Sequence, residues 1–229
     1  MRVIWFSMNY LRKVGAIVWK DLLTELRTRE MVSSMLVFAL LVLLIFSFAF
    51  ELRVEQVMAV APGVLWVTFT FAGMLGLNRA FVLEKDRGCL DGLLLSPVDR
   101  SAIYFGKVLG NTLFMLVVEA IALPLFVLFF NLPFPPLLPL IVFLGTVGFA
   151  GVGTLFSAMT VHTRAREVLL PVLLFPIVVP VIIAAVKLTA GLLDGLSLRE
   201  IMHWLRLLVA FDVIFLAVAY MTFDYVVEE

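Results

Sequence analysis

Two carboxylic acids lie inside long apolar stretches of the sequence, where acidic side chains are rare. Glu119 is near the middle of one stretch and Asp212 lies within another. An acid inside a bilayer is costly, so such a group is a candidate for proton or substrate handling. No basic residue is expected at matching depth. A structural role, as a protonated acid hydrogen-bonded to a neighbouring helix, is equally compatible with the sequence.

The most polar segment of the chain spans residues 84–107, EKDRGCLDGLLLSPVDRSAIYFGK. Its first half has apolar residues at helical spacing, with charges of both signs between them, which predicts an amphipathic helix. Gly88 and Gly92 each weaken such a helix by about 1 kcal/mol relative to alanine. The helix therefore needs support from the membrane surface or from a partner. A membrane-surface helix and a coupling element that passes motion into the bilayer are both open.

The second half of this segment carries the signals of a new helix. Ser96 suits an N-cap, Pro97 the first helical position, and Asp99 the third position of a capping box. The pattern predicts a helix that begins at Pro97 and continues through Lys107 into the next apolar stretch.

Motifs of catalytic sites are absent from the sequence. There is no G-x-x-x-x-G-K-[ST] phosphate loop, no H-E-x-x-H and no G-x-S-x-G. The two histidines, His162 and His203, are far apart in the sequence, and the single cysteine, Cys89, excludes an internal disulfide. We therefore expect a non-catalytic chain that binds no cofactor or metal itself.

The composition indicates whether the chain is a soluble or a membrane protein. Of the 229 residues, 63% are apolar and 15% are charged, whereas a soluble domain has about 45–50% and about 25%. The formal net charge of zero argues against nucleic acid as a partner. These values predict an all-α membrane protein with one transmembrane domain, residues 1–229.

Six apolar stretches are long enough to cross a bilayer as helices, which takes about 20 residues each. The predicted spans are residues 31–50, 57–77, 106–130, 140–160, 168–186 and 204–226. Pro171, Pro176 and Pro180 predict that the fifth span is bent or broken. The polar residues 82–105 form the predicted coupling segment between spans two and three.

Residues 8–29 precede the first span and show helical periodicity. This pattern predicts an amphipathic helix that lies in the membrane plane. Its predicted apolar face comprises Leu11, Val14, Val18, Leu22 and Leu26.

The basic residues predict the orientation of the spans. With the N-terminus inside, 13 of the 17 Lys and Arg residues would be cytoplasmic. The other four are Arg53, Lys187, Arg199 and Arg206. By the positive-inside rule, both termini and the coupling segment are expected in the cytoplasm.

Several stretches of the chain resemble the membrane subunits of ABC-2-type transporters, and more closely the CcmB family, the haem-exporter-type permease of bacterial cytochrome c maturation. The residues that carry the resemblance are Lys20-Asp21-Leu22, Glu25-Arg27-Arg29-Glu30, Pro62-Gly63-Val64-Leu65-Trp66, Asn78-Arg79 and Glu84 to Lys107.

This resemblance implies a set of partners in the bacterial inner membrane. The chain would pair with a second copy and bind two copies of a cytoplasmic ATPase subunit, which carry the ATP. It would also associate with a haem-handling membrane subunit that has a tryptophan-rich motif and with a small accessory membrane subunit. ATP hydrolysis would then release a haem-loaded chaperone, so that haem is handled by the wider complex.

The coupling segment is the predicted contact with the ATPase. Its charged residues would make polar contacts, its leucines would enter a groove on the ATPase, and the helix from Pro97 would carry the movement into the membrane. The predicted coupling residues are Arg79, Glu84, Lys85, Asp86, Arg87, Gly88, Leu90, Leu93, Leu94, Ser96, Pro97 and Arg100.

Three other functions remain open from the residues. An ABC-2-type permease for a drug, lipid or polysaccharide would have the same fold. A proton-driven secondary transporter could use Glu119 and Asp212, but such transporters usually show internal repeats, and none is visible. A passive scaffold for a haem-handling complex is the third.

Overall fold

The computed structural model describes residues 2–49, 54–82, 85, 92, 98–161 and 163–226, with side chains from residue 10 in the first helix and from residue 57 in the third. These parts of the chain are helical, without a strand. The helices are α1 (Arg2–Thr28), α2 (Glu30–Ala49), α3 (Val54–Arg79), α6 (Arg100–Phe130), α7 (Leu138–Thr160), α8 (Arg166–Leu193) and α9 (Leu198–Val226).

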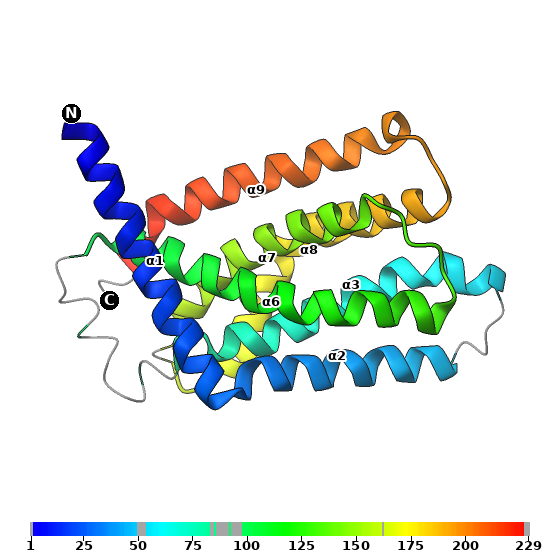
Figure 1. Cartoon of the computed structure of the whole chain (residues 1–229), viewed down its shortest axis with the longest axis horizontal. Coiled ribbons are helices and arrows are strands. Elements are labelled where there is room, and N and C mark those ends of the chain that lie inside the picture. Colours follow the sequence, from blue (N-terminus) through cyan, green and yellow to red (C-terminus); the bar gives the residue numbers. More distant parts are fainter. Residues whose placement is uncertain are drawn as a thin grey trace.

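Six of these helices, α2, α3 and α6–α9, are long and apolar enough to cross a membrane. They run side by side as a bundle, and α1 crosses one end of it obliquely (Figure 1). The N-terminus and the end of α9 lie at that same end. The predicted all-α architecture with six spans is confirmed, and the chain is a multi-pass membrane protein.

The helices extend beyond several predicted boundaries. The helix predicted to begin at Pro97 begins instead at Arg100, with Asp99 as its N-cap. The fifth span was predicted to end at residue 186, but α8 continues to Leu193, and a short turn leads into α9. Lys187 therefore lies on an exposed face inside α8. A long apolar stem lets a lysine near a helix end reach polar surroundings, so a charge does not mark the end of the helix.

The prolines of α8 do not break it. The helix is continuous from Arg166 to Leu193, with Pro171, Pro176 and Pro180 inside it. A buried stripe on one face packs against the bundle and holds the helix despite the lost backbone hydrogen bonds. The stripe includes Leu170, Leu174, Val178, Val181 and Leu188.

The first helix is amphipathic as predicted, and its buried face overlaps the predicted one at Val14, with Val18 and Leu22 half-buried. Val14 and Ile17 are buried, whereas the predicted face residues Leu11 and Leu26 are 67% and 63% exposed. The buried stripe continues at Asp21, because this face packs on α6 through a polar as well as an apolar contact. The exposed Leu11, Leu26 and Trp19 are free to contact lipid.

Close contacts between helices are built on small residues of α7. A side chain at Gly145 would collide with the indole of Trp66 in α3, since a Cβ there would lie 2.3 Å from the ring. The Trp66 Nε1–H also donates a buried hydrogen bond to Thr189 Oγ1 of α8, at 3.0 Å. Without a hydrophobic driving force in lipid, such close packing and buried hydrogen bonds hold helices together.

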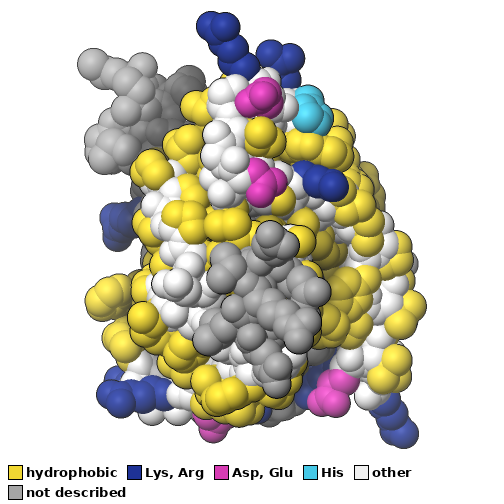
Figure 2. All heavy atoms as spheres, turned by 90° about the vertical axis from the view of Figure 1, so that its right-hand side faces the viewer, with side chains coloured by type: hydrophobic (Ala, Val, Ile, Leu, Met, Phe, Trp, Pro, Cys, Tyr) yellow, Lys and Arg dark blue, Asp and Glu magenta, His cyan; other side chains and the backbone are white. Residues whose placement is uncertain are grey.

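The outer surface of the bundle is apolar. Figure 2 views the end opposite to the termini, where many hydrophobic side chains and scattered charged ones are exposed. Along the flanks of the helices, large apolar side chains such as Val37, Leu128 and Val172 are exposed. Such a surface suits contact with lipid rather than with water.

Candidate functional site at the basic end of the bundle

We call the end of the bundle that carries both termini the basic end. Its most buried charge is the ammonium of Lys107, in the second turn of α6, whose side chain is only 3% exposed. The Lys107 Nζ lies 3.0 Å from Asp21 Oδ2 of α1 and donates to the Ala80 carbonyl oxygen, 3.1 Å away, just after α3. It also lies over the ring of Phe81, 5.2 Å from the ring centre. One cation thus joins three helices.

Glycines let α1 approach α6 closely around this ion pair. A Cβ at Gly106 would lie 2.8 Å from the side chain of Ile17, and one at Gly110 would lie 3.6 Å from Asp21 Oδ2. At the start of α6, the Tyr10 hydroxyl donates to Ser101 Oγ at 3.3 Å. The docking of α1 on α6 is therefore a specific packed contact, not only an association through lipid.

A side-chain hydrogen bond holds the bend between α1 and α2, and an exposed ion pair joins the start of α2 to the end of α3. Arg29, between the two helices, has the left-handed backbone angle φ = 55°. Glu25 Oε1 accepts a hydrogen bond of 2.8 Å from the Val32 backbone N–H, which satisfies a donor at the start of α2. Glu30, the first residue of α2, pairs with Arg79 at the end of α3, at 3.1 Å.

Three of the predicted coupling residues are described, and each contacts another part of this chain. Arg79 pairs with Glu30. The Lys85 Nζ donates to the Val161 carbonyl oxygen at 2.6 Å, and an Arg100 guanidinium N–H donates to the Asp224 carbonyl oxygen at 3.0 Å.

The other nine coupling residues lie outside the described residues, together with most of the predicted amphipathic helix. They are Glu84, Asp86, Arg87, Gly88, Leu90, Leu93, Leu94, Ser96 and Pro97. The ATPase contact assigned to them stays a prediction.

The sequence analysis missed the Asp21–Lys107 pair. Both residues belonged to the quoted resemblance, but neither was assigned a role. Two features of the sequence could have predicted the pair. Lys107 lies at the start of an apolar span, and Asp21 continues the helical stripe of Val14 and Ile17. An uncompensated charge at such positions is costly, so each would have required a partner.

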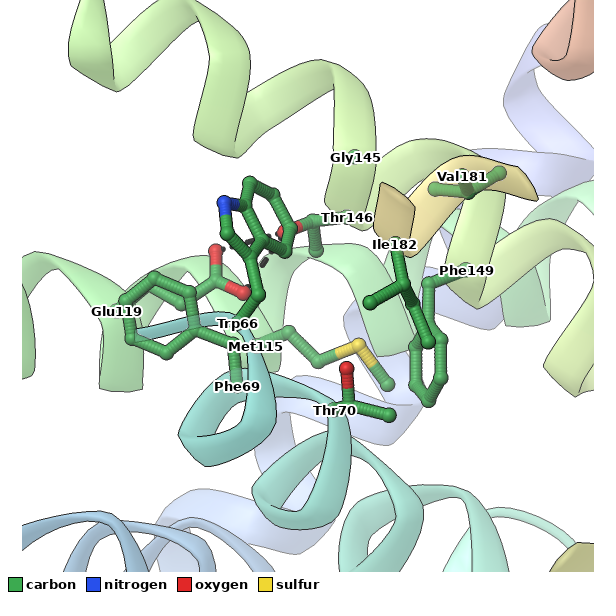
Figure 3. A pocket seen from close by; sticks show the side chains of 10 residues that line it. All are labelled: Trp66, Phe69, Thr70, Met115, Glu119, Gly145, Thr146, Phe149, Val181 and Ile182. Carbon is green, nitrogen blue, oxygen red and sulfur yellow. Dashed lines mark hydrogen bonds between the residues drawn. The ribbon is translucent and has the colours of Figure 1, made fainter. Parts of the chain in front are cut away.

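The first intramembrane acid, Glu119, has a polar partner. Its side chain is buried, and the Thr146 hydroxyl of α7 lies 2.7 Å from Oε1 and 2.9 Å from Oε2. Figure 3 shows the carboxyl group turned toward Thr146 beside the ring of Trp66, in a small cavity. The cavity volume of about 10 Å³ is room for about one water molecule. This geometry matches a structural acid that hydrogen-bonds a neighbouring helix.

The second intramembrane acid, Asp212, is placed differently. It is only 5% exposed, and neither carboxyl oxygen has a hydrogen-bond partner within the described part of the chain. Its carboxyl group packs against Gly148 of α7, where a Cβ would lie 2.1 Å from Oδ1. Glu119 and Asp212 thus face different sides of α7, near residues 146 and 148.

Comparison with known proteins identifies the family. The model of the family described as CcmB protein matches residues 12–228. The chain belongs to the CcmB family. A heme exporter protein B from Rhodobacter capsulatus is 31% identical over 186 residues, which cover 80% of this chain and 85% of the relative. The proteins of the same name from Pseudomonas aeruginosa and Paracoccus denitrificans are 30% and 34% identical, over 76% and 54% of this chain and 79% and 58% of the relative.

The stretches that suggested the CcmB family take part in contacts between helices. Asp21 and Lys107 form the buried pair at the basic end, and Trp66 packs against Gly145. Over the described residues, no three His, Cys, Asp or Glu side chains are grouped so that they could hold a metal ion. The basic end is the candidate site of this CcmB-family chain, because the described coupling residues and the buried Asp21–Lys107 pair all lie there.

Proposed function

We propose that this chain is the membrane-spanning permease subunit of an ABC transporter complex in cytochrome c maturation. It would couple ATP hydrolysis by a separate ATPase subunit to haem delivery and to the release of a haem-loaded chaperone. The observation that carries the proposal is the CcmB family match over residues 12–228, together with relatives named heme exporter protein B. A permease for another cargo and a proton-coupled transporter are not favoured.

The charge distribution supports the orientation that this function requires. In the described part of the chain, the basic end holds the start of α1, the end of α9 and 12 of the 17 Lys and Arg residues of the sequence. The positive-inside rule places such an end in the cytoplasm, where an ATPase can reach it. We therefore infer an inner-membrane protein with both termini in the cytoplasm.

The proposed mechanism starts at the coupling segment, residues 82–105. Two ATPase subunits approach one another when they bind ATP, and each pushes on the coupling segment of one permease copy. Glu84, Asp86 and Arg87 make polar contacts with the ATPase, while Leu90, Leu93 and Leu94 enter a groove on it. The start of α6 receives the movement, because residues 100–105 belong both to the segment and to this helix.

The proposed assembly contains more than these two proteins. A second copy of this chain, two ATPase copies, a haem-handling membrane subunit with a tryptophan-rich motif, a small accessory subunit and the haem chaperone would complete it. The chain itself would bind neither ATP nor a resident cofactor, and haem would be the cargo of the wider complex.

Co-purification tests this proposal. The tagged chain is extracted gently from its own membranes, every bound protein is identified, and ATPase activity is assayed in the preparation. We expect an ATPase and a haem-carrying membrane protein to be bound. A folded preparation that retains neither would overturn the proposal, and an ATPase without the haem-carrying partner would overturn the haem assignment.

A matched pair of variants locates the contact. Arg87→Glu reverses a charge in the coupling segment and should reduce the bound ATPase. Arg164→Glu reverses an exposed charge in the turn after α7 and should retain it. Equal loss of ATPase in both variants would mean that overall charge, and not the coupling segment, determines the binding.

A further inference from the structure

Three membrane helices have their C-terminal ends at the basic end: α3, α7 and α9. The last four carbonyl groups of a helix have no partner inside the helix, and this end carries a partial negative charge. A lysine or arginine that donates to these carbonyls satisfies them and matches the charge. Cations at such ends are therefore well placed to hold the helices in position.

Each of these three helix ends receives a cation from the coupling segment or from the start of α6. Lys107 donates to the carbonyl of Ala80 after α3. Lys85 donates to the carbonyl of Val161, the C-cap of α7. Arg100 donates to the carbonyl of Asp224, in the last turn of α9.

The three contacts differ in how far they are shielded from water. The side chain of Lys107 is 3% exposed. Lys85 is half-buried and its acceptor residue, Val161, is buried, whereas the contact between Arg100 and Asp224 is exposed. Because water competes for exposed groups, the contact of Lys107 should be the firmest and that of Arg100 the weakest.

These cations flank the segment that we propose as the ATPase contact. Lys85 lies near its start, and Arg100 and Lys107 lie near its end. These contacts link Lys85 to α7, Arg100 to α9 and Lys107 to α3, and Lys107 is also linked to α1 through Asp21. A local apolar cluster that includes Phe81, Tyr104, Val161 and Phe223 packs these same elements together.

We propose that Lys85, Arg100 and Lys107 are positioning residues that transmit the movement of the coupling segment to the C-terminal ends of α3, α7 and α9. They act through helix-end carbonyls of this chain and not by contact with the ATPase. This inference rests on the proposed function of the chain as an ATP-coupled permease subunit.

The test compares Lys85→Met, Lys85→Arg and Arg12→Met in the complete complex in membranes. Methionine keeps the stem of Lys85 and removes the donor, whereas arginine keeps a donor. Arg12 is an exposed cation on α1, so its variant controls for the loss of one positive charge. The measurements are the amount of ATPase bound, its hydrolysis rate, and the yield of mature cytochrome c per ATP hydrolysed.

We expect Lys85→Met to retain the ATPase but to lower the cytochrome c yield per ATP by about fivefold or more, in the range of a typical coupling between sites. Lys85→Arg should restore most of the yield, and Arg12→Met should match the wild type. A purely structural role would instead reduce the amount of folded complex without changing the yield per ATP. An unchanged yield in Lys85→Met, or an equal loss in Arg12→Met, would overturn the inference.

A second variant covers the case in which Lys85→Met does not fold. Arg100→Met removes the exposed contact with Asp224, so it should assemble and show a smaller loss of yield per ATP, and no loss would overturn the inference. Absence of any ATPase in the wild-type complex would instead refute the proposed function, so the two failures are distinguishable.

Discussion

The Asp21–Lys107 pair at the basic end and the acids inside the bundle are both buried, but they are stabilised in different ways. At the basic end, Lys107 has an acid, a carbonyl and an aromatic ring around it. Within the bundle, Glu119 has one hydroxyl donor, and Asp212 has no partner among the described residues. Among the described residues, the buried ion pair that joins two helices therefore lies at the basic end, and the acids of the membrane interior form no ion pair.

Removal of Lys107 should have the largest effect on stability. Lys107→Met removes the buried partner of Asp21 and leaves the half-exposed Lys20, 3.3 Å from Asp21 Oδ1, and loss of one member of a buried pair costs up to about 3–5 kcal/mol. Unfolding in mixed micelles measures this loss. The double variant Asp21→Leu/Lys107→Met should be more stable than Lys107→Met alone. If the double variant were the less stable of the two, the pair would not explain the effect.

The packing of Trp66 on Gly145 should give the next largest effect. Gly145→Ala places a methyl group against the indole ring, and overpacking of this kind costs about 1–3 kcal/mol. Gly63→Ala is the control, since nothing lies within 4 Å of a Cβ at that position. Thermal unfolding in detergent compares the two variants. Equal stability of the two would contradict the close contact.

Stability should depend on the hydrogen bond of Glu119 but not on the carboxyl group of Asp212. Thr146→Val removes the only hydrogen bond of Glu119 among the described residues, which costs about 1–3 kcal/mol for a buried group. Asp212→Leu removes a buried carboxyl group that has no such partner, so the free energy of unfolding should not fall. Unfolding measured on both variants sharpens the comparison. A loss for Asp212→Leu as large as that for Thr146→Val would show that Asp212 is engaged in the folded complex.

The bend at Arg29 should give the smallest effect. Its positive φ disfavours side chains that branch at Cβ, so Arg29→Val should be less stable than Arg29→Gly by about 1 kcal/mol. Unfolding of the two purified variants under identical conditions checks the difference. The reverse order would show that the residue does not need the left-handed conformation.

The sequence was sufficient to predict the membrane spans but not the contacts between them. The length of a continuous apolar run can be compared directly with the thickness of the bilayer, so the number of spans was predicted correctly. The partner of a charge depends on which helices meet, and Asp21 and Lys107 are far apart in the sequence. For the same reason, the face of α1 was predicted only in part: periodicity found Val14, whereas packing on α6 also buries Ile17 and leaves Leu11 and Leu26 exposed.

The central claim is that ATP-driven movement enters the membrane domain at the basic end. Its most direct test is the distance between spin labels at positions 28 and 163, both exposed, in a Cys89→Ser background. The label positions lie at the end of α1 and in the turn after α7. In the complete complex with the ATPase, addition of ATP should shift this distance, and Lys85→Met should reduce the shift. An ATP-bound complex in which the distance remains unchanged would contradict the account.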